Sequence, residues 1–495
     1  MSAGRVQSVA VKIIVDRENE IRAFVPEEYW TIDAKFIPEG QRKTFAASFY
    51  GDKSGKIKIS NEEEAKNILT DLEDAEFFVS NVKKGNRKRQ PSPPFITSTL
   101  QQEASKRLNF QSKKTMKIAQ ELYEGVEING VGATGLITYM RTDSLRISED
   151  AIKHTKHYIE SKWGKEYLPT KTRYFKSKAN AQDGHEAIRP TSVEFSPEEL
   201  KPSLTNDQFK LYKLIWERFV ASQMAECILN TTQADISAKD YIFKASGHTV
   251  KFDGFTVLYK DIKDEEEKAK ELPLLKKDMK LKKKELVPSQ HFTQPPARYT
   301  EASLIKTLEE FGIGRPSTYA TTISTITGRE YVLREGKSLK PTELGEVITS
   351  LMKECFPNIV NVKFTAKLED ELDTIESGKI LWTKILENFY VGFKETLDKA
   401  KEAMKGVKIS LKEDQTDIIC DKCGKNMVIK VSRYGKFLAC SGYPECKNKM
   451  KYDPKTKEAI PDEIEESDVL CDKCGKRMII KHGRYGKFLA CPGYP

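Results

Sequence analysis

The sequence predicts a multidomain α+β protein, and three observations support that class. The chain has 495 residues, which is enough to form several hydrophobic cores. Residues 28–60 and 228–290 alternate like β-strands on both sides of a mostly helical block at 95–225, which indicates one domain inserted into another. A cysteine pattern occurs twice after residue 419, which indicates small metal-binding modules.

The first part of the chain combines one helix with strands. Apolar residues follow each other at helical spacing between residues 5 and 24, and the stretches YWTIDAKFI and KTFAASFYG then alternate like strands. The basic run KKGNRKRQPSPP at 83–94 interrupts this alternation. We therefore expect a linker there, between the strands and the helical block.

Helices dominate again after residue 291. A helix from Thr300, the turn GIGRPS, a second helix and a strand-like end are typical of a winged helix-turn-helix unit, which commonly binds DNA. The acidic runs DLED at 71–74 and LEDELD at 368–373 lie in charged helical contexts. We expect both runs to be solvated helix faces.

The cysteines predict zinc. The first copy of the repeat has the spacing C-x2-C-x16-C-x5-C, which provides four thiolates for a closed, structural zinc site at Cys420, Cys423, Cys440 and Cys446. The second copy has three cysteines, Cys471, Cys474 and Cys491, and its fourth would fall at position 497, so we expect this copy to be incomplete. Basic and aromatic residues between the cysteines favour single-stranded DNA as the ligand, and a protein-docking ribbon is the alternative.

Charge and hydropathy restrict the class of partner. There are 83 Lys and Arg residues against 73 Asp and Glu, a net charge of +10 that favours a polyanion. No apolar run approaches the roughly 18 residues of a membrane span, and the N-terminal stretch is not a signal peptide, so we expect a soluble, cytoplasmic protein without a membrane partner. GVGATG at 130–135 precedes a predicted strand and no P-loop motif occurs, so we expect no nucleotide.

The stretch GLITYMRTDS at 135–144 contains the first catalytic candidate. Its apolar and β-branched residues predict a short strand in which Tyr139, Arg141 and Asp143 share one face. A tyrosine hydroxyl has a pKa of about 10, so its attack on phosphorus needs nearby positive charge, which Arg141 can supply. The alternative is an ordinary half-buried tyrosine in a sheet.

A second candidate group lies in AQDGHEAIRPT at 181–191. His185 and Arg189 are four residues apart and would share one face of a helix that ends at Pro190. An imidazole and a guanidinium displayed together suit a phosphodiester, as hydrogen-bond donor and clamp. A histidine with a purely structural role is the alternative.

Five ordered stretches resemble bacterial DNA topoisomerase I of type IA. They are SAGRVQS at 2–8, PSPPFITSTLQQEAS at 91–105, GLITYMRTDS at 135–144, AQDGHEAIRPT at 181–191 and RYTEASLIKTLEEFGIGRPSTYA at 298–320. Met140 is similar to topoisomerase I, whereas the related topoisomerase III enzymes usually have proline there. The resemblance runs from residue 2 to the end of the chain and implies a toroidal core, of mostly helical domains and a β-rich arch, followed by zinc ribbons.

The resemblance also implies the domain boundaries. Residues 1–30 and 291–410 would form a helical DNA-groove domain with a winged-helix-like second part, residues 31–94 and 226–290 the arch, and residues 95–225 the domain with the catalytic tyrosine. The zinc ribbons would occupy residues 418–452 and, incompletely, 469–495.

The implied activity is ATP-independent relaxation of negatively supercoiled DNA by an isomerase. Tyr139 would cleave one strand through a 5′-phosphotyrosyl intermediate, followed by strand passage and religation. Arg141 would hold the scissile phosphate, His185 and Arg189 would assist, and Asp143 would orient the group. The implied DNA contacts are Ser2, Ala3, Gly4, Arg5, Val6, Gln7, Arg141, Arg315, Ser317, Thr318 and Arg329. The partner would be single-stranded or underwound DNA, bound by a monomer in the cytoplasm at the nucleoid.

One departure from the family pattern is large. The family's magnesium-binding Toprim domain, with a glutamate and a D-x-D motif, is expected before SAGRVQ and is not in the sequence. We therefore expect Mg²⁺ in the complete enzyme with ligands outside this chain, and expect both ends of the chain to be cut. The alternative function is a non-catalytic fragment that binds single-stranded DNA and needs the magnesium-binding domain for activity.

Overall fold

The computed structural model contains two compact units, Met1–Lys405 and Gly406–Pro495, and each is described here by itself. The structure describes residues 3–177, 184–260, 271–376, 378, 380–406, 414–432, 435–453, 456, 458–460, 466–483 and 486–493. Within these ranges no helix is both long and apolar enough to cross a lipid bilayer.

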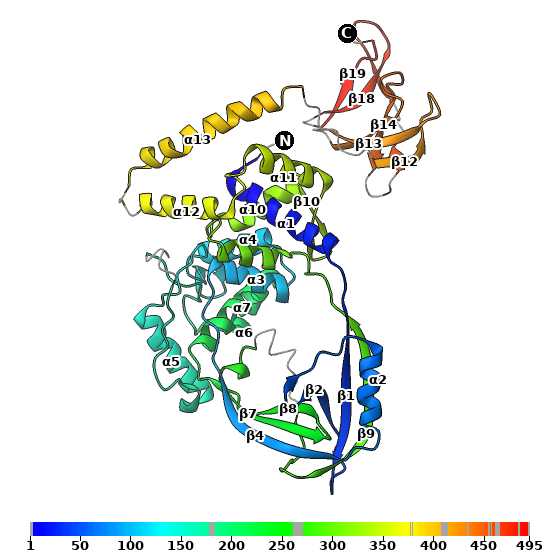
Figure 1. The fold of residues 1–495 in the computed structure, drawn as a ribbon. Coiled ribbons are helices and arrows are strands. Elements are labelled where there is room, and N and C mark those ends of the chain that lie inside the picture. The colour runs from blue at the N-terminus through cyan, green and yellow to red at the C-terminus, as the bar shows by residue number, and fades with distance from the viewer. Residues whose placement is uncertain are drawn as a thin grey trace. The chain divides into compact units, whose positions relative to one another are not determined.

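One antiparallel sheet of seven strands collects both β-rich stretches of the sequence (Figure 1). The strand order is β1-β9-β4-β7-β8-β2-β3, so β9 pairs with β1 and β7 pairs with β4. The strands are β1 (Glu28–Pro38), β2 (Phe45–Asp52), β3 (Gly55–Lys56), β4 (Phe77–Arg89), β7 (Cys227–Ala238), β8 (Tyr241–Phe252) and β9 (Lys280–Phe292). Helix α2 (Glu62–Asp71) packs on the sheet and contributes Ala65 and Ile68 to its core.

The predicted linker at 83–94 is wrong for its first half. Residues 83–89 are the end of β4 and pair with β7 from Lys83 opposite Gln233 to Arg89 opposite Cys227. Most side chains of this stretch are exposed, so the residues lack the apolar alternation that usually marks a strand. This part of β4 is a strand because its backbone pairs with β7. Such pairing between distant segments leaves no local pattern in the sequence.

A first buried cluster, here called the Tyr139 cluster, is built from the helices between the two β-rich stretches. They are α3 (Thr97–Arg107), α4 (Ser112–Glu124), α5 (Glu149–Trp163), α6 (Pro197–Leu200) and α7 (Asn206–Ser222), with a short hairpin of β5 (Val126–Ile128) and β6 (Gly132–Thr134). Leu100, Leu122, Ile215 and Phe219 are fully or almost fully buried in it, and Tyr139 packs against it.

A second buried cluster, the α1 cluster, joins the beginning of the chain to residues beyond 300. Helix α1 (Arg5–Ala23) buries Val9, Ala10 and Ile14 against Leu304 and Ile323. The later elements are α9 (Glu301–Glu310), α10 (Tyr319–Gly328), β10 (Val332–Glu335), β11 (Ser338–Pro341), α11 (Glu343–Cys355), α12 (Val362–Glu376) and α13 (Trp382–Ala403). Helix, turn, helix and hairpin thus follow in the predicted order.

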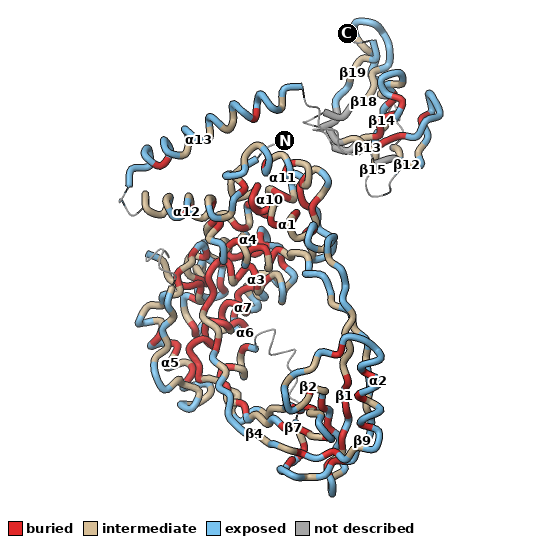
Figure 2. Tube along the Cα trace, viewed as in Figure 1, coloured by how far each residue is buried: buried red, intermediate tan, exposed pale blue. Residues whose placement is uncertain are grey.

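The sheet is connected to the helical clusters at two places. Strands β1 and β9 lead to α1 and α9, whereas β4 and β7 lead to α3 and α7. This double attachment is the connectivity that a toroidal core requires. Buried residues concentrate in the sheet and in the two helical clusters (Figure 2). The residue-level domain boundaries stay a prediction, which these three separate cores support.

The unit Gly406–Pro495 consists of two small sheets. The first contains β12 (Asp414–Ile419), β13 (Asn426–Ser432), β14 (Gly435–Cys440), β15 (Lys449–Asp453) and β16 (Glu458–Ile460). The second contains β17 (Glu466–Leu470), β18 (Arg477–Gly483) and β19 (Gly486–Ala490). The first has a buried cluster of only Met427, Leu438 and two cysteines among its described residues, which is too small to stabilise a module without a further constraint.

Candidate functional site

The segment around Tyr139 is extended but is not the predicted strand. In the described residues around Tyr139, the β-pairing consists of one isolated bridge, between Ile137 and Pro190. The Thr138 amide donates to the Arg189 carbonyl over 2.9 Å, and the Thr191 amide donates to the Leu136 carbonyl over 3.0 Å. The two motifs therefore lie side by side. Because proline has no N–H to donate, Pro190 limits this pairing to a short stretch.

This pairing also corrects the expectation for His185 and Arg189. Residues 187–191 are extended rather than helical, so the two side chains do not share a helix face. The Thr138 hydroxyl donates to the Ala187 carbonyl over 2.7 Å, which adds a side-chain bond between the motifs. The residues from Ala181 to Asp183, which begin the second motif, lie outside the described residues.

Side chains alternate about Tyr139 as the sequence predicts, even without a strand. Met140, Thr142 and Ser144 are buried, whereas Tyr139 and Asp143 are partly exposed and Arg141 is exposed. The first residue of α3 holds the buried side in place. The buried Thr97 hydroxyl donates to the Met140 carbonyl over 2.7 Å and accepts from the Thr142 amide over 2.9 Å.

The Tyr139 ring is in contact with two other rings. Its centroid is 5.4 Å from that of Tyr123, with the planes nearly perpendicular, and 5.0 Å from that of His185. Nδ1 of His185 is buried and has no hydrogen-bond partner in the described part of the chain. Tyr123, at the end of α4, belongs to no motif, and nothing in the sequence marks it as a neighbour of Tyr139.

Arg141 and Arg189 have different surroundings. The Arg189 side chain is only 12% exposed, contacts the Glu186 carboxylate at 2.6 Å and donates to the Pro190 carbonyl over 2.9 Å. The Arg141 side chain is exposed, and none of the described residues forms an ion pair with it. Arg141 therefore can contact a phosphate directly, whereas Arg189 is engaged in holding its own segment.

Asp143, in the Tyr139 segment, lines the same cavity as residues of the GIGRPS turn. A cavity of about 360 Å³ is lined by Ser98 and Asp143 from the Tyr139 cluster and by Arg315 and Tyr319 from the α1 cluster. Burial, with the nearby carboxylates of Glu309 and Asp143, raises the pKa of Tyr319 well above its usual range. Tyr319 therefore keeps its proton at neutral pH.

Apart from Arg141, the described residues expected to bind DNA lie in or beside α1 and α10, the helices that contribute to the α1 cluster. Arg329 Nη1 donates to the Gln7 side chain over 2.7 Å, and the Thr318 hydroxyl accepts from the Arg315 amide over 2.8 Å. The start of α1 contains Val6, and Ala3 and Gly4 directly precede this helix. Ser317 is exposed in the turn before α10. Ser2 lies outside the described residues.

The acidic run LEDELD is not the solvated face expected from the sequence. Glu369 on α12 is 5% exposed and accepts a hydrogen bond from Arg5, and Asp373 pairs with Arg315 at 2.6 Å. Sequence reasoning missed these pairs because each partner lies far away in the chain. Charge patterning within one helix reports only pairs three or four residues apart.

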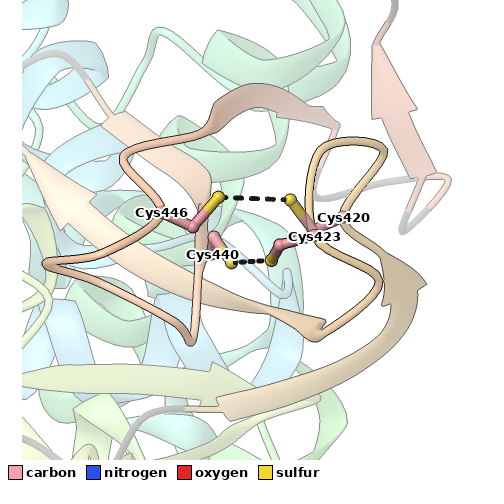
Figure 3. Close-up of side chains that lie close together, drawn as sticks. All are labelled: Cys420, Cys423, Cys440 and Cys446. Carbon is pink, nitrogen blue, oxygen red and sulfur yellow. Dashed lines mark hydrogen bonds between the residues drawn. The ribbon is translucent and has the colours of Figure 1, made fainter.

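Four cysteines of the first ribbon converge on one point (Figure 3). The sulfur of Cys420 lies 3.7 Å from that of Cys446, and the sulfur of Cys423 lies 3.1 Å from that of Cys440. Sulfurs placed tetrahedrally about 2.3 Å from a zinc ion would be about 3.8 Å apart, which is close to the separation of Cys420 and Cys446 and longer than that of Cys423 and Cys440. Four gathered thiol groups are a donor set that suits zinc.

The surroundings of these thiols also favour a bound cation. Burial raises the pKa of Cys420, but hydrogen bonds from the Asn448 side chain and from backbone amides outweigh it and lower this pKa to about 6. The hydrogen bond with Cys423, together with burial, raises the pKa of Cys440 to about 12. Four adjacent thiols cannot all ionise alone, and a zinc ion supplies the charge that stabilises four thiolates.

The second ribbon brings Cys471, Cys474 and Cys491 together, with 3.3 Å between the sulfurs of Cys474 and Cys491. These two cysteine groups are the only sets of three or more potential ligands that gather closely among the described residues. Among the described residues, no three carboxylates gather closely enough to form a magnesium site.

Comparison with known proteins identifies the family. Residues 1–387 match the family model described as DNA topoisomerase, and residues 417–455 and 468–495 match the topoisomerase DNA-binding C4 zinc finger. The structure of full-length topoisomerase I from Thermotoga maritima is similar with a TM-score of 0.70 and 36% identity, over 93% of this chain and 72% of that chain. The chain belongs to the bacterial type IA DNA topoisomerase I family. Its partner is DNA, and its C4 zinc-finger region with the gathered cysteines supports structural zinc.

Proposed function

We propose that this protein relaxes negatively supercoiled DNA without ATP, using Tyr139 as the nucleophile that cleaves one strand. The observation that carries the proposal is the position of Tyr139 within the family fold. Its ring is in contact with the rings of Tyr123 and His185, and it is partly exposed. The exposed Arg141 is two residues away on the more exposed side of the segment. Tyr319, by contrast, is buried.

The proposed step exchanges one phosphate ester for another. Oη of Tyr139 attacks the scissile phosphorus, the bond to the 3′ oxygen breaks, and the 5′ phosphate becomes linked to the tyrosine. The phenol loses its proton, and the departing 3′ oxygen gains one. Arg141 offsets the charge that develops on the phosphate oxygens, and His185 lies close enough to assist hydrogen bonding. Because the ester is conserved, the reverse attack by the 3′ hydroxyl reseals the strand without ATP.

Strand passage requires that contacts between the two helical clusters open while the sheet keeps them joined. The two attachments of the sheet supply that continuity. At the interface, the Glu301 carboxylate accepts from the Ser112 amide over 2.8 Å and from its hydroxyl over 2.7 Å. These bonds would be exchanged for water when the clusters separate.

The preferred ligand in this proposal is single-stranded or underwound DNA. Lys449 lies over the Phe437 ring at 5.8 Å and Lys430 over the Tyr443 ring at 5.8 Å, and the Tyr443 side chain is 61% exposed. Aromatic rings beside lysines suit unpaired bases next to phosphates. The protein would act as a monomer on the nucleoid in the cytoplasm.

A second candidate function is binding of single-stranded DNA without cleavage by these 495 residues alone. The observation that favours this function is that, among the described residues, no three carboxylates lie close enough together to bind a metal ion. In that case cleavage would require a magnesium-binding domain supplied by further polypeptide.

Trapping of the covalent adduct tests these functions. The protein is incubated with magnesium and a single-stranded oligonucleotide labelled at its 3′ end or its 5′ end, and is then denatured. A 5′-phosphotyrosyl link transfers only the 3′ label to the protein. Tyr139→Phe should abolish this transfer, whereas Tyr174→Phe, at a solvent-exposed tyrosine in the same part of the chain, should not change it.

Each result selects one function. Transfer by the protein alone supports the main proposal. Transfer only after a family magnesium-binding domain is added, with binding by the protein alone, supports the second function. No transfer under either condition, or transfer that survives Tyr139→Phe, contradicts the assignment of Tyr139.

A further inference from the structure

A buried carboxylate joins two arginines that the family resemblance places at the DNA. Glu369 of α12 is 5% exposed and accepts from Nη2 of Arg5 at the start of α1. The same carboxylate lies 3.7 Å from Nη1 of Arg315 in the GIGRPS turn. One side chain therefore contacts arginines from two segments that lie more than 300 residues apart in sequence.

The two arginines differ in the donors they still offer. Nε and Nη2 of Arg315 donate to the Asp373 carboxylate over 3.2 and 2.6 Å. Nη1 of Arg315 donates to the Gly314 carbonyl over 2.9 Å. Nη1 of Arg5, by contrast, is buried and has no hydrogen-bond partner in the described part of the chain. An unpaired buried donor costs about 1–3 kcal/mol, and an acceptor that reached Nη1 would remove this cost.

The geometry of a guanidinium indicates which acceptor fits. Its nitrogens form a rigid fork that matches the oxygens of a phosphate, and holding the fork in advance reduces the entropy lost on binding. Glu369 fixes one nitrogen of Arg5 and leaves the neighbouring nitrogen free. The carboxylate also offsets the repulsion between the two arginines.

We propose that Glu369 is a positioning residue that holds Arg5 and Arg315 so that Nη1 of Arg5 receives a backbone phosphate of single-stranded DNA. This inference rests on the proposed function, because it requires DNA in contact with the α1 cluster. Glu369 itself makes no contact with the DNA. It acts through Arg5, as the carboxylates behind metal-binding histidines act through their imidazoles.

Whether one substitution strengthens or weakens DNA binding separates a positioning role of Glu369 from simple electrostatic repulsion. Removing a negative charge near DNA strengthens binding if the carboxylate only repels phosphate or competes with it for the arginines. If the carboxylate positions the arginines, the same substitution weakens binding although the protein becomes more positive. Glu369→Gln keeps the shape of the side chain and removes the charge, so it tests this sign.

Glu371 provides the matched control. It lies on the same helix, is partly exposed and faces Lys367 at 3.7 Å, four residues away. Binding of a fluorescent oligothymidine by the full chain is measured by anisotropy over a range of salt concentrations. We expect Glu369→Gln to weaken binding about tenfold, which corresponds to about 1.4 kcal/mol, and Glu371→Gln to leave binding unchanged or slightly tighter.

A double-mutant cycle with Arg5→Ala distinguishes positioning from a general loss of structure. If Glu369 acts through Arg5, adding Glu369→Gln to Arg5→Ala weakens binding no further. Tighter binding by Glu369→Gln, unchanged binding, or additive losses in the double variant would each overturn the proposal. If Arg5→Ala alone has no effect while the protein binds DNA, this inference fails and the role of Tyr139 is untouched. If the unmodified protein does not bind at all, the proposed function itself fails.

Discussion

Gly135, four residues before Tyr139, lies against the backbone of Tyr123. A Cβ at this position would lie 2.7 Å from the carbonyl oxygen of Tyr123, a backbone atom that cannot move alone. We expect Gly135→Ala to displace the segment that carries Tyr139 and to reduce covalent adduct formation about tenfold. Binding to single-stranded DNA should change less than twofold. Equal losses of adduct and of binding would contradict this account.

At the scale of residues, the sequence predicts which side chains are exposed more readily than it predicts which distant side chains they contact. The alternation about Met140 predicts correctly that Tyr139, Arg141 and Asp143 share the more exposed side. The ring of Tyr123 could not be predicted beside Tyr139, because no local pattern connects the end of α4 to that segment. The burial of Glu369 was missed for the same reason, since its partners Arg5 and Arg315 are distant in the chain.

At the scale of elements, an ion pair connects α1 to the segment before α9. Nε of Arg298 donates to the buried Glu18 carboxylate over 2.8 Å, and this hydrogen bond lowers the pKa of Glu18 below its ordinary value of 4.5. A carboxyl whose pKa is lower in the folded state contributes stability above its unfolded pKa. That contribution is lost as the pH falls through the folded pKa.

We therefore expect Glu18→Gln to lower the free energy of unfolding at pH 7, where the pair is fully charged. The difference from the unmodified protein should shrink as the pH falls below about 4.5, through the lowered pKa of Glu18. Urea unfolding at several pH values measures it. A difference that stays constant over this range would show that the charge of Glu18 contributes nothing.

The two ribbons allow a matched zinc experiment. The protein should hold about one zinc ion per chain, because the tetrathiolate set is complete only in the first ribbon. Cys423→Ser should remove that zinc, whereas Cys474→Ser, at the equivalent position of the second copy, should leave it. Elemental analysis after dialysis gives the stoichiometry. A value near two would mean that the three cysteines of the second ribbon recruit another ligand.

Element prediction succeeded where local spacing carries the information. The helix at the start of the chain, the helix-turn-helix-hairpin order and the cysteine ligand set all follow from spacing within a few residues. The exposed end of β4 and the extended segment of His185 were misjudged, because pairing with β7 and with the Tyr139 segment determines them.

At the scale of the molecule, the ribbons should add to the affinity for DNA. We expect deletion of Gly406–Pro495 to weaken binding of single-stranded DNA and to flatten its dependence on salt, because fewer counterions are released from the DNA. Titrations at several salt concentrations give both quantities. An unchanged slope would indicate that the ribbons contact a protein instead of DNA.

The nesting of two β-rich stretches about a helical block predicts one domain inserted into another, and the seven-stranded sheet that contains both stretches supports this prediction. The contact between the α1 and Tyr139 clusters could not be predicted in this way. It depends on pairs such as Glu301 with Ser112, which have no counterpart in local sequence patterns.

The identity of the residue that becomes linked to DNA tests the central claim most directly. An adduct trapped on single-stranded DNA, with magnesium and a family magnesium-binding domain present, is digested with nuclease and protease and examined by mass spectrometry. The account predicts a nucleotide attached through its 5′ phosphate to the peptide that contains Tyr139. A nucleotide on Tyr123 or on any other residue, or an adduct that still forms after Tyr139→Phe, would contradict it.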